Sequence, residues 1–435
     1  MMRTIDLRGR TLSPAELLAA VPRASEALAA AHEAAALIVD AVRTRGEDAL
    51  REQAERFDRV SGHDIRVPQA HIDEAVAGLD PAVREALETA IARVREASAA
   101  QVPAPRVTEL AAGARVSQRW QPVGRAGVYV PGGKAVYPSS VVMNIVPAQV
   151  AGVGSIALAS PPQAAFDGRV HPTILAVAGL LGVAEVYAIG GAGAVAAFAH
   201  GVPTLGLDPV DVVSGPGNNF VAAAKRLVAG IVGTDAEAGA TEILISADES
   251  ADARLVAYDL VSQAEHDEQA SSLLVTTSPG LAARVAEAIE PIAAATRHAG
   301  RVATALSGPQ SAIVLVDDAA AAEAFSNAYG PEHLELHLTD ADAAAARYTN
   351  AGAVFVGAYS PVSLGDYIAG SNHVLPTGGQ SRYASGLGAY TFLRPQQVIA
   401  YDRAALAEVE GRIVTLADAE QLPAHGEAVA ARFSE

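Results

Sequence analysis

Along the first hundred residues, the order of hydrophobic and polar positions is that of helices. The segment Ser13–Glu16 reads as a capping-box start with proline at the first helical position. Asp80, followed by Pro81, begins another helix that runs towards Ala100. We therefore expect a helical beginning to the chain that carries no obvious chemistry.

From Gly127 onward, short β-branched runs alternate with alanine-rich helical stretches. The first runs are GVYVP, GSIALAS, EVYAIGG and VDVVSG, and a second set comprises TEILISAD from Thr241, SSLLVTT from Ser271, SAIVLVDD from Ser311 and GAVFVG from Gly352. This alternation predicts βαβ units with parallel sheets, and hence an α/β protein with two such units. From about Arg394 the pattern is a strand followed by short helices, which indicates an appendage rather than a third core.

Composition narrows the class of protein. The 435 residues, 50% hydrophobic and 18% charged, fit a compact globular chain with two Rossmann-sized units. A formal charge of -18 disfavours binding to nucleic acid or to an anionic membrane, so small-molecule chemistry is favoured. The charged start MMRTIDLRGR lacks an apolar signal region, and the most apolar stretch, 141–159, is broken by polar residues and proline. We expect a cytoplasmic protein.

The absence of cysteine excludes disulfides, a thiolate nucleophile and cysteine-ligated zinc. Any metal must therefore be held by nitrogen and oxygen ligands. Three segments supply such groups: SQAEHD (Ser262–Asp267), YGPEHLELH (Tyr329–His337) and SNHVLP (Ser371–Pro376). Each places a histidine beside a carboxylate, an amide or both, which are the groups of a metal site with proton transfer.

Gln263 and His266 stand three residues apart on a helix that we expect to begin near Asp252, so both side chains should leave one face. Glutamine is an uncommon zinc ligand, and a histidine on a helix is more often capped or solvated than bound to metal. The pair by itself leaves both interpretations open.

Glu332 and His333 follow a Gly-Pro pair that should end a helix and present both side chains from a loop. A carboxylate beside an imidazole suits acid–base chemistry near neutral pH, and an ordinary turn is the alternative. Asp366 and His373 fall in a loop rich in glycine, serine and proline, where ligand-binding residues are common.

Three glycine-containing segments could approach a dinucleotide. VYVPGGKA (128–135) lacks the first glycine and the Ser/Thr of a phosphate loop, so we reject that motif, although Tyr129 could still pack on a dinucleotide. Gly191, Gly193 and Ala196 have GxGxxA spacing, which close helix–strand packing explains equally well. Asn218, at the helix start after SGPG, suits either a ligand-fixing loop or a plain turn.

Taken in order, these motifs resemble the histidinol dehydrogenase family over nearly the whole chain, from GRAGVYVPGGKAVYPSSVVMN through GPGN, SQAEHD, GPEHLELH and GDYIAGSNHVLPT to AEQLPAH. The resemblance implies two incomplete Rossmann-like α/β domains with a helical N-terminal segment and a small C-terminal appendage. The implied divisions are 1–25 for the N-terminal segment, 26–128 with 241–387 for the zinc-bearing domain, 129–240 for the NAD-contacting domain, and 388–435 for an appendage exchanged in a dimer.

The resemblance also implies a reaction, the four-electron oxidation of L-histidinol through L-histidinal to L-histidine at the end of histidine biosynthesis. NAD+ would be used twice, with one zinc ion per subunit as a template for the substrate. His333 would be the general base, and Glu332 would activate water for the second oxidation. The implied zinc ligands are Gln263, His266, Asp366 and His425; these, with Thr241, His333, His373 and Glu420, would contact substrate, and Tyr129, Gly193 and Asn218 would mark the NAD contacts.

Two positions depart from the family pattern, and a third replacement keeps the chemical group. Thr241 replaces a usual serine and keeps its hydroxyl, Gly193 stands where a glutamine often contacts NAD, and Val362 stands where some members have a substrate-facing glutamate. These departures leave open a related zinc- and NAD-dependent dehydrogenase of another small polyol or sulfonated alcohol. A catalytically silent zinc or nucleotide sensor is a further alternative, although Glu332 and His333 are both present.

The resemblance finally implies a homodimer with shared active sites. In the alternative interpretation, Glu420 and His425 are solvated residues near helix ends. If the terminal segments are exchanged, these two side chains complete the site of the partner subunit.

Overall fold

The computed structural model describes residues 2–23, 27–132, 136–236 and 239–434. They form two compact units, which we describe separately. The first comprises Met1–Gln101 with Val123–Phe392, and the second comprises Val102–Pro122 with Leu393–Glu435. Among the described residues, helices that combine enough length with enough hydrophobicity to cross a bilayer are absent.

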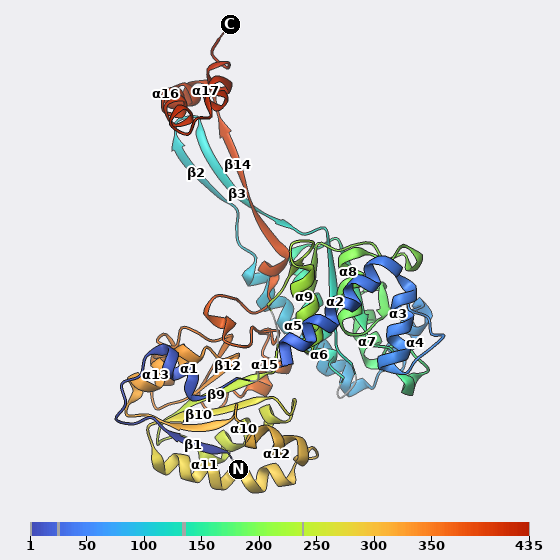
Figure 1. Cartoon of the computed structure of the whole chain (residues 1–435), viewed down its shortest axis with the longest axis vertical. Helices are drawn as coiled ribbons and strands as arrows, with labels where there is room; N and C mark the ends of the chain where they lie inside the picture. The colour runs from blue at the N-terminus through green and yellow to red at the C-terminus, as the bar shows by residue number, and fades with distance from the viewer. Residues whose placement is uncertain (1, 24–26, 133–135, 237–238, 435) are drawn as a thin grey trace. The chain divides into compact units, whose positions relative to one another are not determined.

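The first unit contains a six-stranded parallel sheet in the order β1-β11-β10-β9-β12-β13 (Figure 1). Its strands are β1 (Arg3–Asp6), β9 (Glu242–Ala247), β10 (Ser271–Thr276), β11 (Ala312–Leu315), β12 (His333–His337) and β13 (Ala353–Val356). The helices associated with this sheet are α1 (Pro14–Ala20), α10 (Ala253–Ala264), α11 (Pro279–Ala295), α12 (Ala299–Ser307), α13 (Ala319–Tyr329), α14 (Ala341–Ala345) and α15 (Val362–Tyr367).

Both faces of this sheet are buried, which is why its central strands read as nearly continuous apolar runs. Ile243 and Ile245 of β9 pack with α10, α11 and α12, whereas Leu244 packs on the opposite side with Phe325 and Tyr329 of α13. The side chains of successive residues thus alternate between two separate clusters, as the pleat of a strand requires.

A five-stranded parallel sheet completes the first unit, in the order β6-β5-β4-β7-β8. Its strands are β4 (Arg125–Tyr129), β5 (Ser155–Ser160), β6 (Val186–Ala188), β7 (Val212–Ser214) and β8 (Gly233–Thr234). Its own helices are α6 (Pro138–Ala151), α7 (Pro172–Leu180), α8 (Gly191–His200) and α9 (Asn219–Val228), with short helices η2 (Ala164–Phe166) and η3 (Pro203–Leu205); η4 (Gln380–Arg382) and η5 (Ala389–Phe392) come later in the chain. The two parallel sheets confirm the predicted α/β class.

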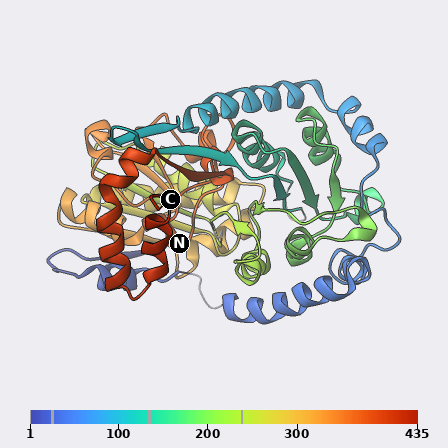
Figure 2. The ribbon, with the colours of Figure 1, turned by 90° about the horizontal axis from the view of Figure 1, so that it is seen from above.

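The N-terminal helices pack over this second sheet. They are α2 (Ala27–Arg45), α3 (Glu47–Gln53), η1 (Ala54–Asp58), α4 (Gln69–Ala77) and α5 (Pro81–Gln101). Helix α2 contacts α8 and α9, whereas α4 contacts α7 and α5 contacts α6, so these helices form an outer layer on either face (Figure 2).

The division that groups 26–128 with 241–387, implied by the resemblance, stays a prediction. Val39 and Val42 of α2 share a core with α8 and α9. An apolar helix face can be read from the pattern of residues, but the sheet that the face covers cannot.

The second unit is a three-stranded antiparallel sheet with two helices. Strands β2 (Arg106–Ala111), β3 (Ala114–Pro122) and β14 (Leu393–Tyr401) pair in the order β14-β3-β2, and α16 (Arg403–Ala419) packs against α17 (Pro423–Ala430). The predicted strand followed by helices from about Arg394 is confirmed, but α16, with 17 residues, is not the short helix that was expected. The sequence pattern does not predict the pairing of β14 with β3. The resemblance instead places 102–122 in the zinc-bearing domain.

The predicted helix starts are correct. Ser13 forms a complete capping box with Glu16, and the Asp80 carboxylate accepts from the amides of the first turn of α5. The first hundred residues are mainly helical, as predicted, but they also contain β1, which pairs with β11 at one edge of the six-stranded sheet.

We expect Gly215→Ala to destabilise the protein by about 1–3 kcal/mol. Gly215 has a φ of 120°, and a Cβ there would lie 1.9 Å from the carbonyl oxygen of Tyr129. The free energy of unfolding in denaturant would measure the loss. Gly300→Ala is the control, because Gly300 lies in α12 with open space around its Cβ position, so this variant should be neutral or more stable by up to about 1 kcal/mol. Equal stability of the two variants would contradict the strain at Gly215.

Candidate functional site

A cavity of about 570 Å³ lies between the two sheets of the first unit, and its volume suits a small ligand. Its lining includes Ser140, Asn218 and Phe220 from the segments of the five-stranded sheet. The six-stranded sheet and its connections contribute Thr241, His266, Glu332, His333, Asp366 and His373. The structure therefore brings most of the predicted site residues together.

The two sheets present opposite ends to this cavity. Thr241 and His333 stand at the amino ends of β9 and β12, where α10 and α13 finish. Ser140 and Asn218 instead stand beyond the carboxyl ends of β4 and β7, where α6 and α9 begin. Because helix C-termini favour cations and helix N-termini favour anions, the first side suits a metal and the second suits a phosphate-bearing ligand.

Glu332 is buried at the start of β12. Its Oε2 accepts hydrogen bonds from Thr241 Oγ1 at 2.6 Å and from the amide of Glu242 at 2.9 Å. Burial raises the pKa of Glu332 above its ordinary value, and the neighbouring His333 opposes that rise. Gly330, with a φ of 59°, ends α13 as predicted, but His333 is the first residue of a strand rather than part of a loop.

His333 has one fixed ring nitrogen and one unpaired nitrogen. Its Nδ1 lies 3.0 Å from the carbonyl oxygen of Glu242, a contact in which the ring must donate. In a neutral imidazole the other nitrogen, Nε2, then carries the lone pair. Among the described residues this Nε2 is buried without a hydrogen-bond partner. The arrangement leaves a base where a substrate hydroxyl could bind.

Gln263 and His266 lie at the end of α10, which begins after its cap Asp252, as predicted. His266 lies beyond the last helical residue, so the expectation that both side chains leave one helix face was wrong. Gln263 Nε2 donates to Thr241 Oγ1 at 2.6 Å, and His266 Nδ1 lies 3.2 Å from the Gln263 carbonyl oxygen.

An unpaired oxygen on Gln263 fits a metal ligand. Within the described part of the chain, Oε1 of this buried side chain has no hydrogen-bond partner. Buried polar atoms are seldom left unpaired, so a cation or a donor from a ligand would satisfy it. The Nδ1 contact of His266 also leaves Nε2 as its metal-binding atom. Gln263, His266 and Asp366 together offer the N/O donor set that zinc accepts.

Asp366 lies in the short helix α15 and not in a loop, which corrects the sequence-based interpretation. His373 follows this helix, and its Nδ1 lies 2.9 Å from the Asp366 carbonyl oxygen. Its Nε2 lies 3.0 Å from Ser140 Oγ on α6, so the hydroxyl donates to the ring. Burial lowers the pKa of His373, which favours this neutral form. Ser140 was missed as a site residue, although it lies in the quoted segment YPSSVVMN.

Of the three expected NAD contacts, only Asn218 lines the cavity. Asn218 caps α9 by accepting from the amide of Phe220. Tyr129 is buried, and its hydroxyl accepts from the amide of Gly191. A Cβ on Gly193 would lie 2.1 Å from Oε1 of Gln53, whose amide group fills the space beside this glycine. NAD binding by Tyr129 and Gly193 stays a prediction.

A buried ion pair holds the loop that leads to Asn218. Lys225 Nζ donates to the Gly215 carbonyl oxygen at 2.6 Å and pairs with Asp235, which accepts from the Gly215 amide at 2.8 Å. One of the two lysines of the chain is thus structural. The other, Lys134, lies outside the described residues, as do 133–135 of the VYVPGGKA motif.

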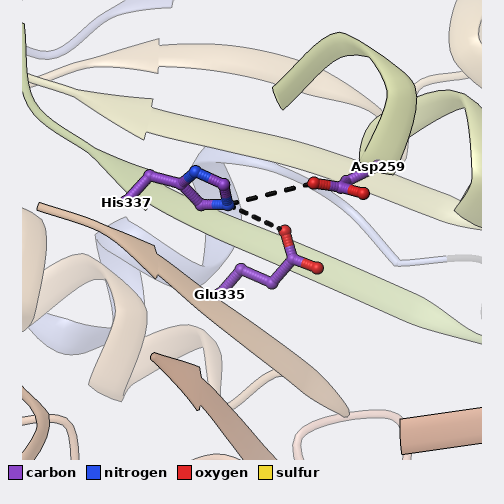
Figure 3. Close-up of side chains that lie close together, drawn as sticks. All are labelled: Asp259, Glu335 and His337. Carbon is purple, nitrogen blue, oxygen red and sulfur yellow. Dashed lines mark hydrogen bonds and ion pairs between the residues drawn. The ribbon is translucent and has the colours of Figure 1, made fainter. Parts of the chain in front are cut away.

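The remaining predicted residues belong to the second unit. Glu420 follows the last residue of α16, and His425 lies in α17. Both are exposed within that unit. Among the described residues, the histidine and carboxylate groups close enough to one another to share a metal are a different set, Asp259, Glu335 and His337 (Figure 3).

Glu242→Gln should change how stability depends on pH. Burial, reinforced by nearby Glu332 and opposed by Arg23, raises the Glu242 pKa from 4.5 to about 7. The folded state therefore binds an extra proton between these values, and the free energy of unfolding falls as pH rises through this window. Relative to the native chain, Glu242→Gln should gain roughly 2–3 kcal/mol between pH 4.5 and 7.

Denaturant unfolding across this pH range would measure the difference. Glu290→Gln, at an exposed position of α11, is the control and should follow the native curve. Parallel curves for the native chain and Glu242→Gln would show that Glu242 ionises normally.

Comparison with known proteins gives a consistent result. The family model for histidinol dehydrogenase matches residues 21–433. A histidinol dehydrogenase of Leifsonia xyli subsp. xyli is 65% identical over 434 residues, covering 100% of each chain. One from Nocardia farcinica is 57% identical over 99% of this chain and 97% of its own.

The fold agrees as well. The crystal structure of histidinol dehydrogenase from Elizabethkingia anophelis matches with a TM-score of 0.92 and 30% identity, covering 99% of this chain and 98% of that one. Sequence and fold therefore agree, and the chain belongs to the histidinol dehydrogenase family.

Proposed function

We propose that this protein oxidises L-histidinol to L-histidine through L-histidinal, in two successive NAD-dependent steps at a zinc-containing site. The proposal is carried by two buried atoms that have no hydrogen-bond partner among the described residues, Nε2 of His333 and Oε1 of Gln263, together with the buried carboxylate of Glu332. The first suits a base, the second suits a metal, and the third suits activation of water.

Zinc would be held by Gln263, His266 and Asp366, together with His425. When bound, the ion supplies a positive centre that orients the imidazole and amino nitrogens of the substrate. The C-terminal end of α10 carries the first two of these ligands near its partial negative charge, which favours a cation.

In the first oxidation, His333 Nε2 takes the hydroxyl proton while a hydride leaves the carbinol carbon for the nicotinamide of NAD+. The products are the aldehyde, NADH and one proton. The hydrogen bond from Nδ1 to the Glu242 carbonyl keeps the ring in the required tautomer.

In the second oxidation, Glu332 takes a proton from the water that adds to the aldehyde, and His333 returns the proton from the first step to the aldehyde oxygen, which gives a hydrate. His333 then takes a hydroxyl proton from the hydrate as a second hydride leaves for another NAD+, and the carboxylate product forms. The raised pKa of Glu332 makes it a better proton acceptor near neutral pH than an ordinary carboxylate. Thr241 Oγ1 and the Glu242 amide hold it in place.

Dehydrogenation of another small polyol or sulfonated alcohol remains the alternative activity. This alternative was supported by the departures at Gly193 and Val362. The second departure is weak support, because Val362 is buried in the core cluster with α10 and is not among the residues that line the cavity. A silent sensor is disfavoured because Glu332 and His333 both line the cavity.

The zinc-loaded protein should form about two NADH for each L-histidinol consumed, with L-histidine as product, as two hydride transfers require. Removal of zinc by a chelator should abolish NADH formation, and added zinc should restore it. In Glu332→Gln the ratio should fall to about one, with release of histidinal, because only the water-dependent half is impaired.

Absorbance at the NADH band and chromatography of the products would measure both quantities. Glu290→Gln provides a matched surface control with the native ratio. No NADH from L-histidinol, together with activity on another alcohol, would overturn the choice of substrate. A native ratio of about one would overturn the assignment of Glu332.

We further propose a cytoplasmic homodimer in which the second unit of each subunit completes the site of the other through Glu420 and His425. The exposed apolar side chains of that unit support a partner surface, since Ile399, Leu416 and Leu422 are 68%, 64% and 45% exposed.

Truncation before Arg412 should abolish activity while the first unit stays folded. Co-expression of Glu332→Gln with His425→Ala should restore L-histidine formation, which each variant alone lacks, because each mixed dimer regains one native site; random pairing gives about a quarter of the native rate. Activity of the purified mixed dimer would be compared with that of each variant alone. A fully active truncated protein, or mixed dimers as inactive as the variants, would refute the exchange.

A further inference from the structure

Three ionisable side chains, two of them buried and one partly buried, meet away from the cavity lining. Glu335 and His337 lie on β12 and Asp259 lies on α10 (Figure 3). His337 Nε2 lies 3.3 Å from Glu335 Oε2 and 3.9 Å from Asp259 Oδ2. Glu335 is 0% exposed, and His337 is 5% exposed. Buried charged groups need a compensating role, and the catalytic steps use none of these three.

This cluster lies next to the proposed active site along both β12 and α10. His333, Glu335 and His337 occupy every second position of β12. Their side chains therefore share one face of the strand, at steps of about 7 Å. On α10, Asp259 and Gln263 are separated by four residues, so they share one face at a rise of about 6 Å. The same two elements thus carry a site residue and a cluster residue side by side.

Glu335 also contacts the third element of the site. Its Oε1 accepts a hydrogen bond from the Val362 amide at 2.7 Å. Val362 is the first residue of α15, and Asp366 lies one turn later in the same helix. The N-cap of α15 is Pro361, which has no side-chain hydrogen bond to offer. Glu335 therefore takes over the capping of the helix that carries Asp366.

The charge state of the cluster favours this role over a second metal site. Burial and the nearby Glu335 raise the Asp259 pKa to about 7, so the two carboxyl groups can share a proton. One oxygen of Glu335 is already occupied by the Val362 amide. Within the described part of the chain, the ring atom of His337 without a hydrogen-bond partner is Nδ1, whereas the atom that faces the carboxylates is Nε2.

We propose that Glu335 is a positioning residue that holds the start of α15, and through it Asp366, for metal binding, while His337 and Asp259 fix its carboxylate. The expected effect on zinc binding rests on the proposed function. The hydrogen bond between Glu335 and the Val362 amide does not. It assigns a purpose to the second acidic residue of the GPEHLELH segment.

Two substitutions remove the same hydrogen bond from opposite sides. Glu335→Ala removes the acceptor. Val362→Pro removes the donor at the first helical position, where proline is tolerated, and the extended ψ of 155° at Pro361 suits a following proline. Glu335→Gln keeps an oxygen that can accept from Val362. Full-length zinc-free protein would be followed by hydrogen exchange over α15, and zinc affinity by competition with a chromophoric chelator.

In Glu335→Ala and Val362→Pro, we expect faster exchange of the α15 amides and a zinc Kd higher by about 10–100-fold. The d–d absorption of the Co²⁺-substituted protein should shift as well. Glu335→Gln should stay near the native exchange rate and affinity. Should Glu335→Ala fail to fold, Val362→Pro still tests the contact.

Ser246→Ala is the matched control. Ser246 is buried on β9, on the opposite face of the same sheet, where its hydroxyl contacts Tyr348. This variant should lose stability but keep native α15 exchange and zinc affinity. Native exchange over α15 in both Glu335→Ala and Val362→Pro would overturn the proposal, as would equal acceleration in Ser246→Ala. A second zinc equivalent that is lost in Asp259→Asn would replace positioning with metal binding.

Failure of the proposed function would give a different pattern. If Asp366 is not a zinc ligand, Asp366→Asn leaves the native zinc Kd unchanged, whereas the exchange of α15 still reports on Glu335. If the zinc site is correct and Glu335 does not position it, Asp366→Asn weakens zinc and Glu335→Ala does not.

Discussion

The opposite polarity of the two parallel sheets at the cavity is the constraint on which the site depends. The six-stranded sheet presents the amino ends of its strands and the C-termini of α10 and α13. The five-stranded sheet presents the carboxyl ends of its strands and the N-termini of α6 and α9. One wall is thereby suited to a cation and the other to an anion. Ligands of parallel sheets usually bind at carboxyl ends, so the first wall departs from the common arrangement.

A repeated hydrogen bond gives the site histidines their chemical roles. His333, His266 and His373 each direct Nδ1 at a backbone carbonyl, namely that of Glu242, Gln263 and Asp366 respectively. Backbone carbonyls only accept, so Nδ1 must carry a proton, and in a neutral ring the lone pair is then on Nε2. The backbone thus selects a tautomer that can bind metal, take a proton or accept from Ser140, and it does so without any additional charged group.

Below this layer, buried charges secure the segments that carry the site. Lys225 and Asp235 hold the loop before Asn218, and Glu335 holds the first residue of α15. Such pairs seldom add much net stability, because desolvation offsets their attraction. Their contribution here is geometric, since Lys225 and Asp235 tie α9 to the loop before Asn218, and Glu335 ties β12 to α15. Rigid support of this kind is what a site built from several segments requires.

Much of the site could be read from the order of residues. The helix start at Asp252, the helix end at Gly330 and the adjacent pair Glu332–His333 are local features, and local geometry follows from backbone preferences and capping. The absence of cysteine already restricted a metal to nitrogen and oxygen ligands. The α/β class followed from the alternation of strands and helices.

Contacts between distant segments could not be read in this way. Ser140 and His373 are separated by 233 positions, and Glu335 and Val362 by 27, so no local pattern relates them. The sheet that α2 to α5 cover, the pairing of β14 with β3 and the face of β12 that meets α10 were decided by tertiary packing. Sequence alone determined the elements and the chemical groups, because these depend on neighbouring residues. The tertiary structure decided which groups meet and which atoms stay unpaired, because these depend on how apolar faces are buried together.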